Sequence, residues 1–324
     1  MRKDFIAFLI FFTLSKDIYP LTSKYSNPLK KKDSTQPSII RADNGYYYLY
    51  VAGENIYKSL DLINWEFVGQ PFEGVKRPAY LVYESPCITK QGDEYILYFT
   101  LQYYGGALDK QAIGVATSKS PEGPFQIVGD DAKLLSNEEV DVRNSIDPYF
   151  IQEGGSKYIL FGMFFGIYYI ELTEDGIGVK DLNSKTQLAG TLFQAPYIYK
   201  RMNYYYLFAS IGTSGGEGST YKLVVGRSTH FRGPYTNKDG GSMLNNHYEV
   251  ILSENTKFIG PGHNARIIVD KDGKTWMIYE ALIKGEANIG NVLCMDEIKW
   301  TDDGWPYFEG GSPSTDEQIG PNIL

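Results

Sequence analysis

The sequence has 324 residues and a formal net charge of −8 at pH 7, and its isoelectric point lies near 5.1. Because nucleic-acid binding requires a basic face for the phosphates, this acidic balance argues against a nucleic-acid partner. The 27 tyrosines and 34 glycines, together with the lack of a long apolar helical stripe, predict short strands separated by turns.

The first 20 residues have the pattern of a signal peptide. Arg2 and Lys3 precede an apolar stretch at residues 5–14, which is too short to span a membrane. The following Ser15-Lys16-Asp17 lacks the small residues of a typical cleavage site. We therefore expect a secreted or periplasmic protein without membrane insertion, in which residues 25–324 form the folded domain.

A repeated pattern organises these residues. A short segment that carries a proline precedes a strand rich in aromatic and β-branched residues, and a second strand then ends in a turn. The prolines stand at positions 37, 86, 148, 196 and 261, and the predicted strands at residues 46–51, 95–100, 158–162, 204–209 and 275–279. Each unit has room for about four short strands, the content of a propeller blade. The sequence therefore predicts an all-β fold, a five-bladed β-propeller.

Polar residues open all five repeats. They are Gln36, Glu84, Asp147, Gln194 and His263. Because the first strand of each propeller blade lines the central channel, we expect these side chains to converge on one axial pocket. Polar residues at strand starts are also common turn formers. Five of them at equivalent places favour a shared site over five unrelated turns.

Several further segments occur in one order along the chain. They are Ser145-Ile146-Asp147-Pro148, residues 195–201 before 204–208, residues 219–221 before 225–228, Gly260-Pro261-Gly262-His263 and Asp303-Gly304-Trp305-Pro306. Together they resemble glycoside hydrolase family 43, most of all its endo-1,5-α-arabinanases, over residues 25–321. The resemblance implies hydrolysis of O-glycosyl bonds in α-L-arabinofuranosyl polymers, with arabinan or arabino-oligosaccharides as partners. We expect the protein to be a monomer.

The resemblance also implies roles for three positions. Enzymes of that family invert the anomeric carbon with an Asp base in the first blade and a Glu acid in the fourth, assisted by an Asp in the third. Here the base position is Gln36, the acid position is Gln194 and the assisting acid is Asp147. An amide is a poor acid and a poor base, and each such catalyst is typically worth about 10²–10⁴ in rate. We therefore expect ordinary family chemistry to be severely impaired.

Two interpretations follow from the substitutions. In the first, the protein is a hydrolase whose carboxyls have moved, with Glu84 as a surrogate acid and Glu280 also facing the pocket. Some exo-galactanases of the family similarly rely on a second-blade Glu and an amide acting through its imidic tautomer, although this chain lacks their fourth-blade Glu. In the second, the pocket binds an arabinan-type glycan without cleaving it, and the amides of Gln36 and Gln194 pair with sugar hydroxyls. The alternative interpretation of Glu84, and likewise of Glu280, is a buried structural carboxylate paired with a neighbouring basic residue.

Other residues complete the predicted site. We expect Asn144 to hydrogen-bond Asp147. His263 resembles the family histidine that holds Ca²⁺ or a similar cation on the propeller axis through water. A single histidine without a cluster of ligands is by itself weak evidence for a metal, and we expect no other cofactor. The residues predicted to bind substrate are Asn144, Tyr149, Tyr197 and Glu280.

Overall fold

The computed structural model describes residues 23–32, 34–78, 81–102 and 110–323. The predicted signal segment, residues 1–20, lies outside these residues. Regular structure in the described part is almost entirely strand. Apart from the short helix α1 (Asn137–Val140), it has 3₁₀ turns at Met243–Asn245, Ala287–Ile289 and Glu309–Gly311. No helix in the described part is both long and apolar enough to cross a membrane.

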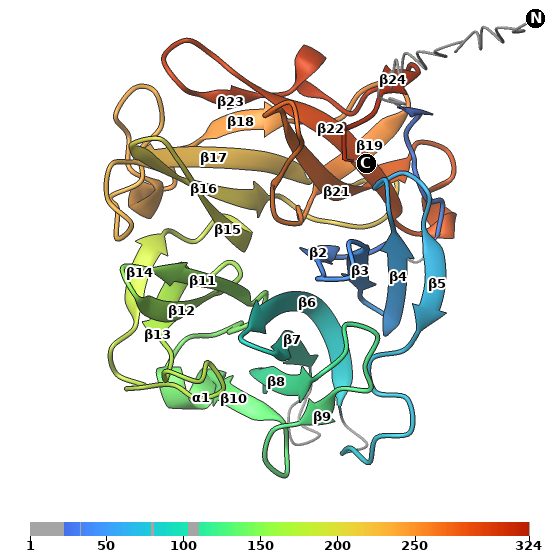
Figure 1. The fold of residues 1–324 in the computed structure, drawn as a ribbon. Helices are drawn as coiled ribbons and strands as arrows, with labels where there is room; N and C mark the ends of the chain where they lie inside the picture. The colour runs from blue at the N-terminus through green and yellow to red at the C-terminus, as the bar shows by residue number, and fades with distance from the viewer. Residues whose placement is uncertain (1–22, 33, 79–80, 103–109, 324) are drawn as a thin grey trace, which may run out of the picture.

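Five antiparallel sheets surround a central axis (Figure 1). We number them as blades I to V in chain order, and each runs from an innermost strand outwards, which confirms the predicted five-bladed propeller.

Blade I contains β2 (Ser38–Arg41), β3 (Tyr47–Val51), β4 (Asn55–Ser59) and β5 (Glu66–Gly69). Blade II contains β6 (Val82–Gln91), β7 (Glu94–Gln102), β8 (Ala112–Ser118) and β10 (Lys133–Ser136), and β9 (Gln126–Ile127) pairs with β8. Blade III contains β11 (Tyr149–Glu153), β12 (Ser156–Phe161), β13 (Ile167–Glu171) and β14 (Thr186–Ala189). Blade IV contains β15 (Phe193–Arg201), β16 (Tyr204–Ile211), β17 (Lys222–Ser228) and β18 (Glu249–Leu252). Blade V contains β19 (Phe258–Gly262), β21 (Thr275–Ile283), β22 (Val292–Trp300) and β23 (Pro306–Tyr307), and β20 (Ile268–Val269) pairs with β21.

The second strand of each blade is buried on both faces over most of its length. Strand β3 shows why the second strands are continuous aromatic and aliphatic runs, because all five of its residues are buried. Tyr48 and Tyr50 belong to the core cluster between blades I and II, whereas Tyr47, Leu49 and Val51 belong to the cluster between blades I and V. Successive side chains of a strand point to opposite faces, so neither face of such a strand is left for polar residues.

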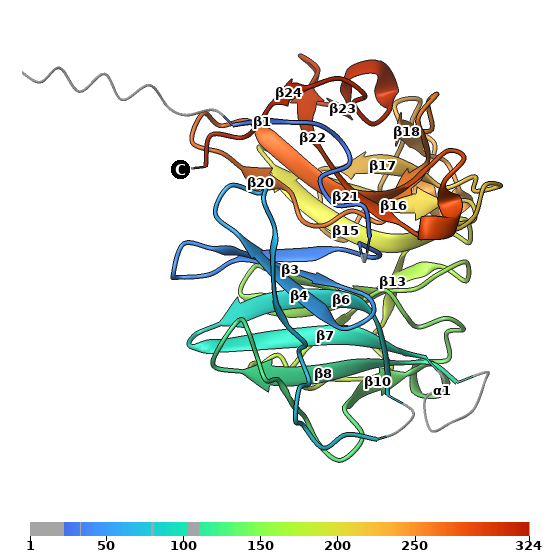
Figure 2. The same ribbon diagram turned by 90° about the vertical axis from the view of Figure 1, so that its right-hand side faces the viewer.

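The ring closes through the segment that precedes blade I. Strand β1 (Lys24–Tyr25) pairs with β24 (Gln318–Ile319), beside blade V (Figure 2). Further along, the backbone N–H of Leu29 donates to the carbonyl of Leu293 (2.8 Å), and that of Leu293 donates to the carbonyl of Lys30 (2.8 Å). The N-terminal segment thus joins the last blade before the chain enters the first.

The side chain of Asn27 strengthens this junction. Its Nδ2 donates to the carbonyl of Met295 (3.1 Å) and to Oδ2 of Asp296 (3.0 Å), and its Oδ1 accepts the N–H of Met295 (2.9 Å). Asn27 is only 2% exposed. The amide of Asn27 therefore satisfies several buried polar groups of β22, much as the backbone of a neighbouring strand would.

Candidate active site

A cavity of about 250 Å³ lies on the propeller axis and receives side chains from all five blades. We call it the axial pocket. It brings together the five polar residues that open the sequence repeats, and Glu280 joins them from β21. The lining residues are Thr35, Gln36, Glu84, Ser85, Gln102, Ile146, Asp147, Met163, Gln194, Ser214, Gly215, Tyr221, His263, Glu280 and Asn291.

Each blade contributes one residue in the left-handed backbone conformation at this pocket or directly beside it. These residues are Gln36, Ser85, Asp147, Ala195 and His263, with φ angles of 55°, 44°, 57°, 50° and 43°. A positive φ is uncommon for residues other than glycine, and such positions gather at functional sites. In blades I to IV the residue is followed directly by proline. The repeated conformation shows that these five residues occupy equivalent places.

A ring of hydrogen bonds between blades holds these residues. In every case the backbone N–H of the left-handed residue donates to a side chain of the preceding blade. The pairs are Gln36 N with Glu280 Oε2 (2.7 Å), Ser85 N with Gln36 Oε1 (2.8 Å), Asp147 N with Thr100 Oγ1 (3.0 Å), Ala195 N with Asp147 Oδ2 (3.1 Å) and His263 N with Ser210 Oγ (2.9 Å). The geometry of the pocket is therefore fixed by the contacts that join the blades to one another.

This equivalence corrects one part of the sequence analysis. The counterparts of Gln36 in blades II and IV are Ser85 and Ala195, and Glu84 and Gln194 each lie one residue earlier. Glu84 and Gln194 still line the pocket because β6 and β15 shift register directly after them, so each strand bulges at the proline step. A bulge changes the direction in which neighbouring side chains point.

The side chain of Asp147 is held by hydrogen bonds from two other blades. It is 5% exposed. Its Oδ1 accepts the hydroxyl of Ser85 (2.7 Å) and its Oδ2 accepts the N–H of Ala195 (3.1 Å). Blades II and IV thus both donate to this one carboxylate of blade III, which fixes its orientation.

The two glutamines at the predicted base and acid positions are also oriented by the protein. Oε1 of Gln36 accepts the N–H of Ser85 (2.8 Å), while Nε2 of Gln194 donates to the carbonyl of Gly212 (2.9 Å). An amide has both donor and acceptor ends. Within the described part of the chain, the amino end of Gln36 and the oxygen of Gln194 are the ends that these contacts leave for a ligand.

Glu280 and Glu84 differ sharply in environment. Glu280 is 3% exposed, and burial raises the pKa of its carboxyl to about 8, although hydrogen bonds from Gln36 and Asn291 oppose the shift. Glu84 is half-buried and accepts a hydrogen bond from Nε2 of Gln102 (3.2 Å). Among the described residues Glu84 forms no ion pair, so the structural pairing with a basic residue that we considered for it is not found.

A smaller cavity, of about 30 Å³, adjoins the axial pocket and shares Asp147 and His263 with it. Burial lowers the pKa of His263, and the nearby Asp147 acts in the opposite direction. Asn264 also lines this cavity, and its buried Oδ1 has no hydrogen-bond partner in the described part of the chain. A neutral imidazole and an unpaired carbonyl oxygen thus border a space about as large as one water molecule.

Residues 25–306 match the family model for glycosyl hydrolases family 43. This chain belongs to glycosyl hydrolase family 43. The extracellular exo-α-(1→5)-L-arabinofuranosidase of Cellvibrio japonicus (strain Ueda107) is 28% identical over 308 residues, which cover 86% of this chain and 87% of that protein. The extracellular endo-α-(1→5)-L-arabinanase 1 of Bacillus subtilis (strain 168) is 28% identical over 293 residues, or 84% of this chain and 86% of that protein.

Solved structures of family 43 have the same fold. The α-L-arabinanase of Cellvibrio cellulosa in complex with arabinohexaose aligns with a TM-score of 0.75 and 26% identity, covering 86% of this chain and 96% of that one. The endo-arabinanase of Bacillus licheniformis aligns with a TM-score of 0.72 and 26% identity, covering 86% and 99%. The family resemblance that the motifs indicated is thereby confirmed.

Three residues predicted to bind substrate do not line the axial pocket of this family 43 chain. Tyr149 lines the smaller cavity instead. Tyr197 is buried between blades, where its hydroxyl accepts the N–H of Ile267 (2.8 Å) and its ring meets that of Tyr149 edge-on at 4.8 Å. Asn144 lies in the turn before Asp147, and its carbonyl accepts the N–H of Ile146 (2.9 Å). The inner strands carry both tyrosines away from the pocket, which explains their positions.

Sequence reasoning also missed residues that shape the site. Thr100 and Ser210 are fully buried and accept the N–H groups of left-handed residues in the next blade. Their signal is a hydroxyl residue near the end of the aromatic run in the repeats of blades II and IV. Ser85 had a signal too, because it directly precedes the proline, as Gln36 and Asp147 do.

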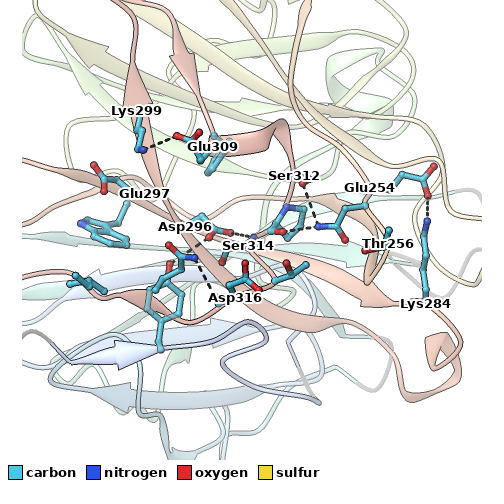
Figure 3. A pocket seen from close by; sticks show the side chains of 18 residues that line it. Glu254, Thr256, Lys284, Asp296, Glu297, Lys299, Glu309, Ser312, Ser314 and Asp316 are labelled. Atoms are coloured by element: carbon cyan, nitrogen blue, oxygen red, sulfur yellow. Dashed lines mark hydrogen bonds and ion pairs between the residues drawn. The ribbon is translucent and has the colours of Figure 1, made fainter.

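A larger cavity, of about 730 Å³, lies at the outer part of blade V (Figure 3). Four of its charged groups form two ion pairs, Lys284 with Glu254 (2.9 Å) and Lys299 with Glu309 (2.7 Å). Asp296 at its base accepts hydrogen bonds from Asn27 and Ser314. None of the residues at the predicted catalytic positions lines it, so size does not make it the active site of a family 43 protein.

Proposed function

We propose that this chain hydrolyses O-glycosyl bonds in α-L-arabinofuranosyl polymers, with arabinan or arabino-oligosaccharides as substrates. Family membership and relatives named as arabinanases and an arabinofuranosidase support the substrate class. The observation that carries the proposal is the convergence of three carboxyls, from Glu84, Asp147 and Glu280, on one axial pocket. Hydrolysis with inversion requires two carboxyl groups that flank the scissile bond.

In this proposal the catalytic carboxyls have moved from their family positions. Gln36 stands at the base position and Gln194 at the acid position, so neither supplies the usual proton transfer. Asp147 remains as the assisting acid. Glu84 and Glu280 then supply the carboxyls that the two glutamines lack, from blades II and V.

The remaining residues of the pocket bind and orient the sugar. The amino end of Gln36 can donate to a sugar hydroxyl, and the oxygen of Gln194 can accept from one. Tyr221 adds a protonated phenol, because burial raises its pKa well above the usual range and Glu280 and Asp147 raise it further. Holding the ring in one orientation contributes to the rate by removing motional freedom before reaction.

A second candidate function is glycan binding without cleavage. It is favoured by one specific observation, that both family positions for proton transfer carry amides held in place by hydrogen bonds, Gln36 to Ser85 and Gln194 to Gly212. Neutral amides form hydrogen bonds with sugar hydroxyls as carboxylates do, but they do not transfer the protons that cleavage requires.

One experiment separates the two functions. The purified full chain is incubated with linear arabinan and with arabino-oligosaccharides, and products and binding are measured in the same samples. Formation of shorter arabino-oligosaccharides or arabinose at a rate above that of a matched sample without protein supports hydrolysis. Saturable binding without products overturns hydrolysis and supports the binding function, whereas neither binding nor products overturns arabinan as the ligand.

We also propose that the protein is exported, to the medium or the periplasm. The pattern of residues 1–20 supports this location, as do the relatives named extracellular. Immunodetection of the full chain outside the cytoplasm, and its retention inside when residues 2–14 are deleted, would support export. Equal retention of both forms would overturn it.

A hydrated cation beside His263, with Ca²⁺ as the first candidate, is a further part of the proposal. The neutral imidazole and the unpaired Oδ1 of Asn264 fit such an ion, with Asp147 close by. The described residues contain no group of three His, Cys, Asp or Glu side chains able to hold a metal, so water would supply most of the ligands. The ion would add positive charge beside Asp147.

Chelation tests the cation directly. We expect EDTA to lower the thermal unfolding midpoint and Ca²⁺ to restore it, because a ligand that binds only the folded state stabilises that state. The variant His263→Gln should respond to neither addition. A wild-type midpoint that EDTA and Ca²⁺ leave unchanged would contradict the proposal.

A further inference from the structure

Glu280 occupies a position at which the fold requires only a hydrogen-bond acceptor. In blades II and IV the corresponding acceptors are the hydroxyls of Thr100 and Ser210, which bind the N–H groups of Asp147 and His263. In blade V the acceptor for Gln36 N is a carboxyl. Since a hydroxyl performs this task in two equivalent places, the contact between blades does not explain why an ionisable group is present.

A carboxyl at this position is energetically unfavourable when ionised. Glu280 is 3% exposed, and transfer of a charge out of water is costly unless it is paired. Among the residues that the structure describes, no Lys or Arg lines the axial pocket. The groups that face Glu280 or act on it are the N–H of Gln36, the side chain of Asn291, the carboxylate of Asp147 and the phenol of Tyr221, and Glu84 and His263 line the same pocket.

These surroundings favour the protonated form of Glu280. Burial is the main cause and outweighs the hydrogen bonds from Gln36 and Asn291, and the pKa near 8 leaves the group largely as a carboxylic acid at neutral pH. Glu84 lies in the same pocket but is half-buried, and an amide is its hydrogen-bond partner. Two carboxyls of one pocket in such different environments are the usual arrangement of an acid and a base.

We propose that Glu280 is the proton donor of the reaction and that Glu84 is the base. This inference rests on the proposed hydrolysis, and it assigns proton donation to Glu280 in place of Glu84. Glu280 transfers its proton to the glycosidic oxygen as the bond from that oxygen to the anomeric carbon breaks. Glu84 takes a proton from a water molecule, whose oxygen forms the new bond to the anomeric carbon. The products are two sugar hydroxyls, and solvent returns the proton from Glu84 to Glu280.

The test compares substrates that differ in their need for an acid. Arabinotriose has a poor leaving group that must be protonated, whereas 4-nitrophenyl α-L-arabinofuranoside releases a stable phenolate. We expect Glu280→Gln to lower kcat on arabinotriose by about 10²–10⁴ and to affect the aryl substrate much less. Glu84→Gln should lower kcat on both substrates. The control Glu254→Gln changes an exposed glutamate of the outer cavity and should match the wild type.

A second variant separates proton donation from the contact between blades. Glu280→Thr places at this position the residue that blade II uses, so it should keep the hydrogen bond to Gln36 and the unfolding midpoint, yet lose arabinotriose cleavage as Glu280→Gln does. The wild-type kcat should fall as the pH rises through about 8, where Glu280 loses its proton. That decline should be absent from the residual activity of Glu280→Gln.

Each other outcome overturns the inference. Arabinotriose cleavage by Glu280→Gln at the wild-type rate, or equal losses on both substrates, would remove Glu280 as donor while hydrolysis stands. Unfolding of both variants would show that the residue serves only to join the blades. A wild type that cleaves neither substrate would overturn the proposed hydrolysis itself, and the donor with it.

Discussion

At the scale of single residues, Gln36 shows how one function of a carboxylate can be kept while another is lost. Asp147 holds the N–H of Ala195 in blade IV, and Gln36 holds the N–H of Ser85 in blade II in the same way. The amide oxygen is sufficient for this contact. The amide cannot take a proton from water at a useful rate. The blades therefore stay joined, but another residue must supply the proton transfer.

Restoration of both family carboxyls should therefore raise activity. The double variant Gln36→Asp with Gln194→Glu should increase arabinan hydrolysis far more than either single change, because an acid and a base act in the same transition state. Asp147 shows that an aspartate in the left-handed position reaches the next blade. The gain should be about 10²–10⁴ for each catalyst, measured as kcat on arabino-oligosaccharides. A folded double variant that binds arabinan without any gain would contradict this expectation.

The pKa of Glu280 predicts how stability depends on pH. The pKa of about 8 in the folded protein lies above the ordinary value of 4.5. The contribution of Glu280 to the unfolding free energy is therefore complete below the pKa of the unfolded chain and is lost as the pH rises through the folded pKa. Between these values the unfolding free energy of the wild type should fall relative to that of Glu280→Gln, by at most about 1.4 kcal/mol per pH unit. Urea unfolding of both proteins between pH 5 and pH 8 measures the gap. Parallel curves would contradict the prediction.

At the scale of elements, the inner strand of blade V depends on close approach to blade IV. A Cβ on Gly262 would lie 2.5 Å from the ring of Tyr221 and 2.9 Å from Oγ of Ser210. The missing side chain therefore lets β19 lie against Tyr221, which lines the axial pocket beside Glu280. The last two residues of the motif Gly260-Pro261-Gly262-His263 thus have separate tasks, since Gly262 gives room and His263 contacts Ser210.

Substitution of this glycine should damage stability and binding together. Gly262→Ala should lower the unfolding free energy by about 1–3 kcal/mol, as overpacking commonly does, and should weaken arabino-oligosaccharide binding because Tyr221 must move. Chemical unfolding and calorimetric titration measure the two effects. Gly218→Ala is the control, since nothing lies within 4 Å of a Cβ at that position. Equal behaviour of the two variants would show that Tyr221 tolerates the methyl group.

The sequence predicted the elements well, and their register less well. The expected strands at residues 46–51 and 204–209 correspond to β3 (Tyr47–Val51) and β16 (Tyr204–Ile211), because continuous aromatic runs are unambiguous. The alignment of Glu84 and Gln194 with Gln36 was one residue out, since spacing to a proline does not show which residue adopts a positive φ. The role of Thr100 could not be predicted at all, because its partner lies in another blade, 47 residues away.

At the scale of the whole molecule, the ring is held shut by the contacts of the N-terminal segment with β22. Asn27 is central among them, since it joins Met295 and Asp296, 268 and 269 residues away in sequence. Lys257 Nζ also donates to its carbonyl (2.7 Å). The side-chain contacts lie in a buried environment where water does not replace a lost partner.

Loss of this amide should weaken the whole propeller. Asn27→Ala should lower the unfolding free energy by about 2–4 kcal/mol. The substitution leaves buried polar groups of β22 without a hydrogen-bond partner, and each such group costs about 1–3 kcal/mol. Equilibrium unfolding in urea measures the loss, with the exposed Asn203→Ala as the control. A single cooperative transition with a lower midpoint is expected. An unchanged midpoint would show that backbone pairing alone closes the ring.

The same closure sets an order of events in synthesis. Residues 24–30 are synthesised before blade I, whereas their partners between Val292 and Ile319 belong to blade V or follow it. Until then the first segment has no strand to pair with, and blade I has only one neighbour. Contacts between residues so distant in sequence form slowly and leave strand edges exposed meanwhile. The ring is therefore still open while blades II to IV are made, and it closes only after residues 292–319 have been synthesised.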